Sequence, residues 1–279
     1  MVEMSFTQIL VLAIVQGLTE FLPVSSSGHL ILIPALTSWP DQGVVTDVMV
    51  HVGSLFAVIA YFWRDVLMLL KGTGEMVMRK NTPGARMAGY IALATIPALA
   101  FGAFMKLSGF QDAIRGVEIV AWNAVIFGIL LYVADVVGKR TKVMEDMKLS
   151  PALVIGVAQA MAIIPGTSRS GITMTAARFL GFERAEAARF SFLLGIPAIA
   201  AAGAFTALEL IETGGNIPAD ALKAAGLTFF AALAAIALLM AIVKRYGFFM
   251  FMVYRLLLAF VLFGLLYDWF PGISLSEKL

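Results

Sequence analysis

An amide and a carboxylate stand four positions apart in an apolar part of the sequence, at Gln16 and Glu20. On a helix this spacing brings both side chains to one face. Their oxygen atoms suit a hard cation such as Mg²⁺ or Ca²⁺, so the pair predicts a metal site. The structural alternative is that Glu20 caps a helical turn or pairs with Arg169, because a buried carboxylate needs a partner.

A serine-rich turn follows and ends in a histidine: Ser25, Ser26, Ser27, Gly28 and His29. The three-residue step from Ser26 to His29 places a hydroxyl and an imidazole on one face of a helix that begins here. A hydroxyl becomes a useful nucleophile when a neighbouring base accepts its proton. The serines are also typical of a helix N-cap, and a helix start binds anions, so both interpretations hold together.

A second polar turn, later in the chain, combines an arginine with hydroxyls: Ser168, Arg169, Ser170 and Thr173. The planar guanidinium of Arg169 can bind two phosphate oxygens, and hydroxyl and backbone N–H groups can fill the remaining acceptors. The turn therefore predicts a phosphate site. The alternative is an arginine that only neutralises Glu20.

Two other ionisable residues lie in apolar segments without a motif around them. We expect His51 to be solvated or hydrogen-bonded rather than a ligand, and Arg255 to pair with a carboxylate or a carbonyl. The sequence has no cysteine, which excludes disulfides and thiolate chemistry. It also has no Walker loop, kinase loop or HExxH zinc pair.

The segments that carry these residues belong in a membrane. Hydrophobic residues make up 61% of the 279 positions and charged residues 14%, with a mean hydropathy of +0.93. A soluble fold could not cover such a core with so little polar surface. The net charge of +2 indicates no nucleic-acid partner. Six stretches are long enough to cross the hydrocarbon layer: Thr46–Trp63, Met87–Lys106, Val117–Val137, Ala187–Glu209, Leu222–Val243 and Phe249–Asp268.

Two further apolar regions, Ser5–Leu36 and Ser150–Leu180, are interrupted by proline, glycine and hydroxyl residues. Such backbone is tolerated at membrane depth only where protein buries it or a wet cavity receives it, so each region predicts a re-entrant helix pair. A shift of 143 positions sets Gln16 on Gln159, and the two serine motifs on each other. Three spans follow each pair, so the second copy is inverted, and paired broken helices in such folds form the site.

The predicted fold is an all-α polytopic membrane protein with six full spans and two re-entrant helix pairs. One integral membrane domain comprises a first repeat, residues 1–140, and a second, inverted repeat, residues 141–279. No cleavable signal peptide is expected, because Met1–Ser5 carries no Lys or Arg. Tracing the chain puts fourteen basic residues on one side and four on the other, which places both termini outside the cytoplasm. The four are Lys106, Arg115, Lys223 and Lys278.

The chain resembles the undecaprenyl-pyrophosphate phosphatase family, known also for bacitracin resistance, over nearly its whole length. Two motifs carry the resemblance: Gln16-x-x-x-Glu20-Phe21-Leu22-Pro23-Val24-Ser25-Ser26-Ser27-Gly28-His29-Leu30 and Pro165-Gly166-Thr167-Ser168-Arg169-Ser170-Gly171-x-Thr173. The resemblance implies a multi-pass protein of the bacterial plasma membrane. It also implies hydrolysis of the terminal phosphate of undecaprenyl pyrophosphate with a divalent cation, which recycles the lipid carrier for cell-wall synthesis.

The same resemblance assigns roles. Its catalytic positions are Glu20, Ser26, His29 and Arg169 here, and its substrate-binding positions are Ser25, Ser27, Ser168, Ser170 and Thr173. Many members carry Glu where this chain has Gln16, which puts metal affinity in doubt. Ser26 is the predicted nucleophile with His29 as general base or acid, and attack by water that His29 or Glu20 activates is the alternative.

A secondary transporter or lipid flippase is the alternative function, because inverted repeats with broken helices are also a transporter architecture. A transporter needs no Ser–His pair beside an arginine and releases no phosphate. A scaffold without a site would leave Glu20, His29 and Arg169 unexplained. The expected partners are a polyprenyl pyrophosphate lipid and membrane lipids, with a homodimer as a candidate assembly.

Overall fold

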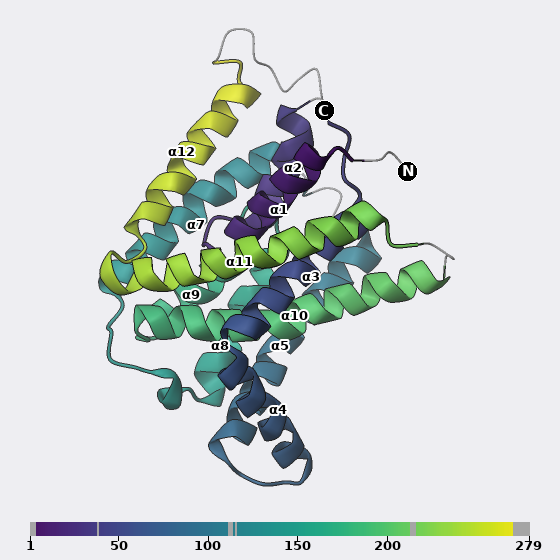
Figure 1. Cartoon of the computed structure of the whole chain (residues 1–279). Coiled ribbons are helices and arrows are strands. Elements are labelled where there is room, and N and C mark those ends of the chain that lie inside the picture. Colours follow the sequence, from purple (N-terminus) through teal and green to yellow (C-terminus); the bar gives the residue numbers. More distant parts are fainter. Residues whose placement is uncertain (1–3, 38, 111–113, 115, 213–215, 270–279) are drawn as a thin grey trace.

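The computed structural model describes residues 4–37, 39–110, 114, 116–212 and 216–269. Among them, six helices are long and apolar enough to cross a membrane, and these agree with the six predicted spans in number and order. They are α3 (Val44–Tyr61), α5 (Pro83–Ser108), α7 (Val117–Val137), α10 (Arg184–Glu212), α11 (Ala219–Arg245) and α12 (Phe249–Leu266). The all-helical polytopic fold is therefore confirmed (Figure 1). Of the residues used for orientation, Arg115 and Lys278 lie outside the described residues.

Several of these helices extend beyond the predicted spans because their polar ends continue the helix. α5 begins at Pro83, whose fixed φ and missing N–H suit the first turn of a helix. The Thr82 hydroxyl before it accepts a hydrogen bond from the Ala85 amide at 3.1 Å. Hydropathy marks the apolar centre of a helix, whereas caps such as Thr82 decide where it begins.

One helix is not predicted by the sequence analysis. α4 (Trp63–Val77) follows α3 with only Phe62 between them, and it packs against α5 at the lower end of the view in Figure 1. It carries too many polar residues to qualify as a span, yet it has an apolar face, which is the pattern of a surface helix. Hydropathy alone therefore misses it.

Four shorter helices occupy the two interrupted regions. They are α1 (Phe6–Phe21), α2 (Ser26–Leu36), α8 (Leu149–Ala160) and α9 (Arg169–Phe179). None reaches the length of about 20 residues that a full span needs. We call residues 22–25, between α1 and α2, the first serine turn, and residues 164–168, before α9, the second serine turn.

The two serine turns have the same local geometry. Ser25 and Ser168 are the N-caps of α2 and α9, with φ of 76° and 72°. Their hydroxyl oxygens accept hydrogen bonds from the Gly28 and Gly171 amides at 3.4 Å and 3.1 Å. A positive φ is uncommon for a residue other than glycine, so two such serines 143 positions apart are a shared and specific feature.

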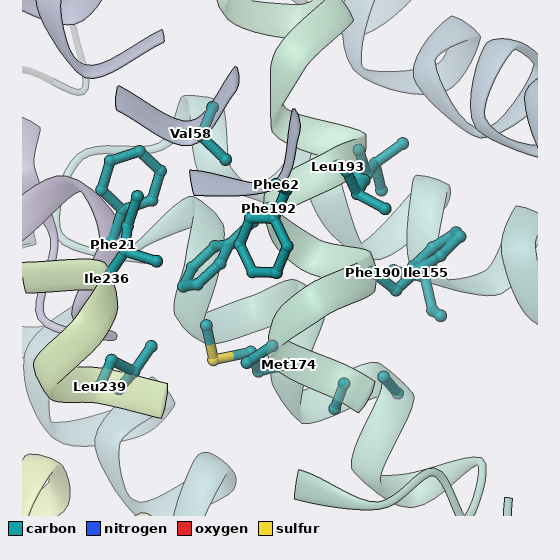
Figure 2. Close-up of a cluster of buried hydrophobic side chains, with 14 of the residues drawn as sticks. Phe21, Val58, Phe62, Ile155, Met174, Phe190, Phe192, Leu193, Ile236 and Leu239 are labelled. Carbon is teal, nitrogen blue, oxygen red and sulfur yellow. The ribbon is translucent and has the colours of Figure 1, made fainter. Parts of the chain in front are cut away.

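The largest apolar core joins both interrupted regions to the long helices (Figure 2). Phe21, at the end of α1, meets Phe192 of α10 edge to face with the ring centroids 5.1 Å apart. Ile155 of α8 and Met174 of α9 belong to the same cluster. Packing in this core thus holds α1 directly beside the first serine turn, and holds α8 and α9 on either side of the second.

Candidate active site

Glu20 is the centre of a polar cluster between the two serine turns. Its side chain is 5% exposed. Oε1 accepts a hydrogen bond from Nη2 of Arg169 at 2.7 Å, and Oε2 accepts one from the Ser26 hydroxyl at 2.7 Å. The predicted approach of Glu20 and Arg169 is confirmed. The first residues of α2 and α9, far apart in the sequence, therefore meet at one carboxylate.

Local structure explains this arrangement. α1 ends at Phe21, one residue after Glu20, because Pro23 does not suit the interior of a helix. The chain then reverses its direction. α2 then begins at Ser26, which brings its hydroxyl back to Glu20. In the other half Arg169 is the first residue of α9. The Ser170 hydroxyl also donates to the Leu22 carbonyl oxygen at 3.1 Å, which ties the two halves directly.

Arg169 is held on its other side by α10. Its Nη1 donates to the Ser191 carbonyl oxygen at 3.0 Å, and its side chain is 15% exposed. Gly195, one turn further along α10, faces the guanidinium so closely that a Cβ there would overlap it. The fork of Arg169 is thus fixed between a carboxylate and a carbonyl, with its position set by a glycine.

A cavity of about 310 Å³ opens beside this cluster. Its polar wall consists of Glu20, Ser25, Ser26, Ser27, Asp47, His51, Ser168 and Arg169. Its apolar wall consists of Val48, Ala162, Ala198, Ile199, Ala202 and Gly203. A charged group with a hydrocarbon tail fits such a division, because each part meets surface of its own kind.

His51 is a site residue that the sequence analysis did not select. Its Nε2 lies 3.4 Å from Oε2 of Glu20, and its Nδ1 lies 2.7 Å from the Asp47 carbonyl oxygen. With Nδ1–H donating to that carbonyl, Nε2 is the nitrogen that faces the cavity. Asp47 and His51 are four residues apart on α3, so their common face was the signal available in the sequence.

His29 lies apart from this cluster. Its Nε2 is 2.6 Å from the Tyr254 hydroxyl on α12, and its Nδ1 is 2.7 Å from the Ser25 carbonyl oxygen. It does not belong to the described residues that line the cavity. The structure therefore brings Glu20, Ser26 and Arg169 together and turns His29 toward α12. Its catalytic role stays a prediction.

Gln16 presents its amide nitrogen to the carboxylate. Nε2 donates to Oε2 of Glu20 at 3.1 Å and lies 3.4 Å from the Ser54 hydroxyl, while Oε1 is buried without a partner. Turning the amide over would set its oxygen against a carboxylate oxygen. Among the described residues, no group of three or more His, Asp or Glu is arranged to hold a metal. Gln16 and Glu20 as they lie do not fit a cation site.

The predicted substrate-binding residues fall into two sets. Ser25, Ser27 and Ser168 line the cavity. Thr173 lies behind it, with its hydroxyl 2.6 Å from that of Ser191 and donating to the Arg169 carbonyl oxygen at 2.8 Å. Ser170 likewise bonds to protein. The first set can reach a ligand, and the second set supports the turn.

The chain is similar over most of its length to a known family and to named proteins. The family model described as bacitracin resistance protein BacA matches residues 9–261. An undecaprenyl-diphosphatase of Erythrobacter litoralis is 49% identical over 274 residues, which covers 90% of this chain and 96% of that protein. One from a Jannaschia species is 47% identical over 95% of this chain and 100% of its own length. Undecaprenyl-diphosphatase 1 of Rhodospirillum rubrum is 45% identical over 95% of this chain and 96% of its own length.

Proposed function

Because the chain belongs to the bacitracin resistance protein BacA family, we propose that it is an integral membrane phosphatase. Its reaction is the hydrolysis of undecaprenyl pyrophosphate to undecaprenyl phosphate and phosphate, which recycles a cell-wall lipid carrier. The observation that carries this proposal is the meeting of Ser26, Glu20 and Arg169 at one cavity. A hydroxyl, a base and a guanidinium are the groups that phosphoryl transfer needs.

In the proposed complex the pyrophosphate occupies the polar wall and the first part of the lipid tail lies on the apolar wall. Arg169 exchanges part of its contact with Glu20 for the terminal phosphate. The N-termini of α2 and α9 both begin at this cavity, and their free N–H groups favour an anion. Fixed donors of this kind stabilise the charge that develops on phosphoryl oxygens.

Ser26 is the proposed nucleophile and Glu20 its base, since Glu20 rather than His29 accepts the hydrogen bond of the hydroxyl. Ser26 Oγ bonds to the terminal phosphorus, the bond to the lipid phosphate breaks, and the hydroxyl proton passes to Glu20. Water then attacks the phosphoserine and the Ser26 Oγ–phosphorus bond breaks. Glu20 returns its proton to Ser26 Oγ, and the released phosphate keeps both protons of the water. Direct attack by water activated by Glu20 is the alternative chemistry.

The proposed membrane arrangement has two re-entrant helix pairs and an inverted repeat in the bacterial plasma membrane. Its support is the shortness of α1, α2, α8 and α9 and the matching positive φ of Ser25 and Ser168. Half-helices of this kind meet at the site in inverted-repeat folds. Both termini are placed outside the cytoplasm by the positive-inside rule, and the homodimer stays a prediction.

The proposal includes a divalent cation, Mg²⁺ or Ca²⁺, only because the resemblance to the family implies one. The observed arrangement of Gln16 and Glu20 does not fit a cation site. Such an ion would offset phosphate charge when bound. No step above requires it. Hydrolysis by protein treated with EDTA, with and without added Mg²⁺, tests the dependence. Unchanged activity in EDTA would remove the cation from the proposal.

The decisive experiment measures phosphate release from undecaprenyl pyrophosphate by the purified full chain, with Ser26→Ala as the matched variant. We expect steady release by the parent and none by the variant, and a phosphorylated serine trapped by acid quench. Robust hydrolysis by the Ser26→Ala protein would exclude the serine ester. Movement of lipid across vesicles without phosphate release by the parent would favour the transporter or flippase.

A further inference from the structure

Arg255 is a buried cation that the proposed reaction does not use. It lies on α12 and has no exposed surface. Among the residues that the structure describes, its hydrogen bonds all go to backbone carbonyl oxygens, and no carboxylate pairs with it. The expectation that Arg255 pairs with a carboxylate or a carbonyl is confirmed for the carbonyl. Removing a charge from water costs free energy, so the burial of Arg255 needs an explanation.

The acceptors come from α7 and from both serine turns. Their distances to the guanidinium are 2.7 Å for Gly166, 2.8 Å for Asn123, 3.1 Å for Thr167, 3.2 Å for Ala124 and 3.5 Å for Pro23. Gly171 leaves room for this group, since a Cβ there would lie 3.3 Å from Nη1 of Arg255. One side chain therefore touches both interruptions of the helical backbone at once.

Broken backbone explains why an arginine is needed. Carbonyls in a turn lack helical partners, and inside a membrane protein they must be satisfied by other protein groups. A guanidinium offers five N–H donors in a fixed plane, which suits acceptors from several segments. The N-cap Ser168, with its positive φ, directly follows the Thr167 carbonyl that Arg255 binds, and the matching N-cap Ser25 lies two residues after Pro23. Backbone in such a conformation persists only where its surroundings fix it.

We propose that Arg255 is a positioning residue that sets the separation and orientation of the two serine turns. Ser26 directly follows the first serine turn and Arg169 directly follows the second, so Arg255 controls the geometry between nucleophile and phosphate-binding group. It acts from behind the turns and does not belong to the described residues that line the cavity. The inference rests on the proposed phosphatase function for its kinetic part only.

The test compares Arg255→Lys and Arg255→Gln with Arg178→Lys in the full chain. Arg178 is a matched control because it is also fully buried and donates to the Asp135 carboxylate and to carbonyls such as that of Gly138. The measurements are kcat and KM per folded protein and hydrogen–deuterium exchange of the turn amides. For Arg255→Gln we expect a kcat loss of about 10- to 100-fold with KM within about threefold, as misplacement of reacting groups produces.

We expect the kcat of Arg255→Lys to lie between those of the parent and Arg255→Gln. Hydrogen–deuterium exchange should become faster in both serine turns of the Arg255 variants but not in Arg178→Lys. Parent kcat in folded Arg255→Gln would overturn the proposal. So would faster exchange confined to α12, or the same kcat loss per folded protein in Arg178→Lys. If Arg255→Gln does not fold, Arg255→Lys decides alone. A parent without phosphatase activity would refute the proposed function, and the exchange data would still test Arg255.

Discussion

Glu20 accepts hydrogen bonds from Arg169, Ser26 and Gln16, which lie on three different helices or turns. A buried carboxylate is costly unless each lone pair has a partner, and these contacts remove most of that cost. They also leave Glu20 ready to exchange partners, since a phosphate can take Arg169 while Glu20 takes a proton. The same residue thus stabilises the resting site and serves the proposed chemistry.

Arg169→Lys keeps the charge and loses the planar fork. A lysine cannot hold Glu20, the Ser191 carbonyl and a phosphate in one plane, so we expect kcat/KM to fall by about 10²–10³-fold, as for loss of one transition-state donor. Steady-state hydrolysis of the lipid pyrophosphate measures this. The control is Arg245→Lys, an exposed arginine at the end of α11. Equal rates for Arg169→Lys and the parent would show that Arg169 does not bind phosphate.

Glu20→Gln and His29→Ala separate the two candidate bases. The Ser26 hydroxyl donates to Glu20, whereas His29 contacts Tyr254, so we expect Glu20→Gln to lose about 10²–10⁴-fold in kcat, and His29→Ala to lose less. Single-turnover hydrolysis of both purified variants provides the comparison. A larger loss for His29→Ala would restore the imidazole as the general base.

At the scale of elements, α10 fixes both halves of the site. Phe192 packs on Phe21, the sequence neighbour of Glu20. Ser191, just before Phe192, and Gly195, nearly one turn after it, contact Arg169. Phe192 is fully buried, and removing such a ring typically costs about 3–5 kcal/mol of stability. A single helix therefore joins the apolar core to the polar cluster, which makes the relative position of α1 and α9 part of the packed interior.

Gly195→Ala tests this coupling. The added Cβ would overlap the flexible end of Arg169, so the arginine moves while the helix gains propensity of about 1 kcal/mol. We expect unfolding temperature to stay near the parent and kcat/KM to fall by about 10- to 100-fold. Gly226→Ala on α11 is the control, because nothing lies within 4 Å of its added Cβ. Matching activity in the two variants would show that Gly195 does not position Arg169.

At the scale of the whole molecule, α3 and α4 follow each other along the chain, and α4 lies beyond the end of α3 that is farther from Asp41 (Figure 1). The basic residues of the α4–α5 region include Arg64, Lys71 and Lys80, whereas Asp41 precedes α3. From the positive-inside rule we predict that α4 lies in the cytoplasm and Asp41 outside it. Asp47, in the first turn of α3, lines the cavity, so this orientation predicts access from the outer side.

Single cysteines test that orientation, and the natural chain contains none to interfere. In intact cells a membrane-impermeant maleimide should label Asp41→Cys, and should label Lys80→Cys only after the membrane is opened. Both side chains are exposed, so labelling depends only on whether the maleimide reaches that side of the membrane. Phosphatase activity of each variant confirms that it is folded. Labelling of Lys80→Cys in intact cells would reverse the proposed topology.

The sequence by itself determined the membrane class, the six spans and the two interruptions. Long runs of apolar residues predict helices in lipid, because a helix satisfies its own backbone. The clusters of proline, serine and glycine around Pro23 and Pro165 predict interruptions of such helices. The pairing of Glu20 with Arg169 was also predictable, because each is a charge in an apolar region and needs the other.

Only the tertiary structure decided which side chains share the cavity. His51 joins Glu20 because α3 packs beside α1, and His29 leaves Ser26 because Tyr254 of α12 takes its imidazole. The amide direction of Gln16 and the carbonyl contacts of Arg255 depend on atoms up to 232 positions away in the sequence. Spacing along a helix fixes the face on which a side chain lies, but the helix packed against that face fixes its partner.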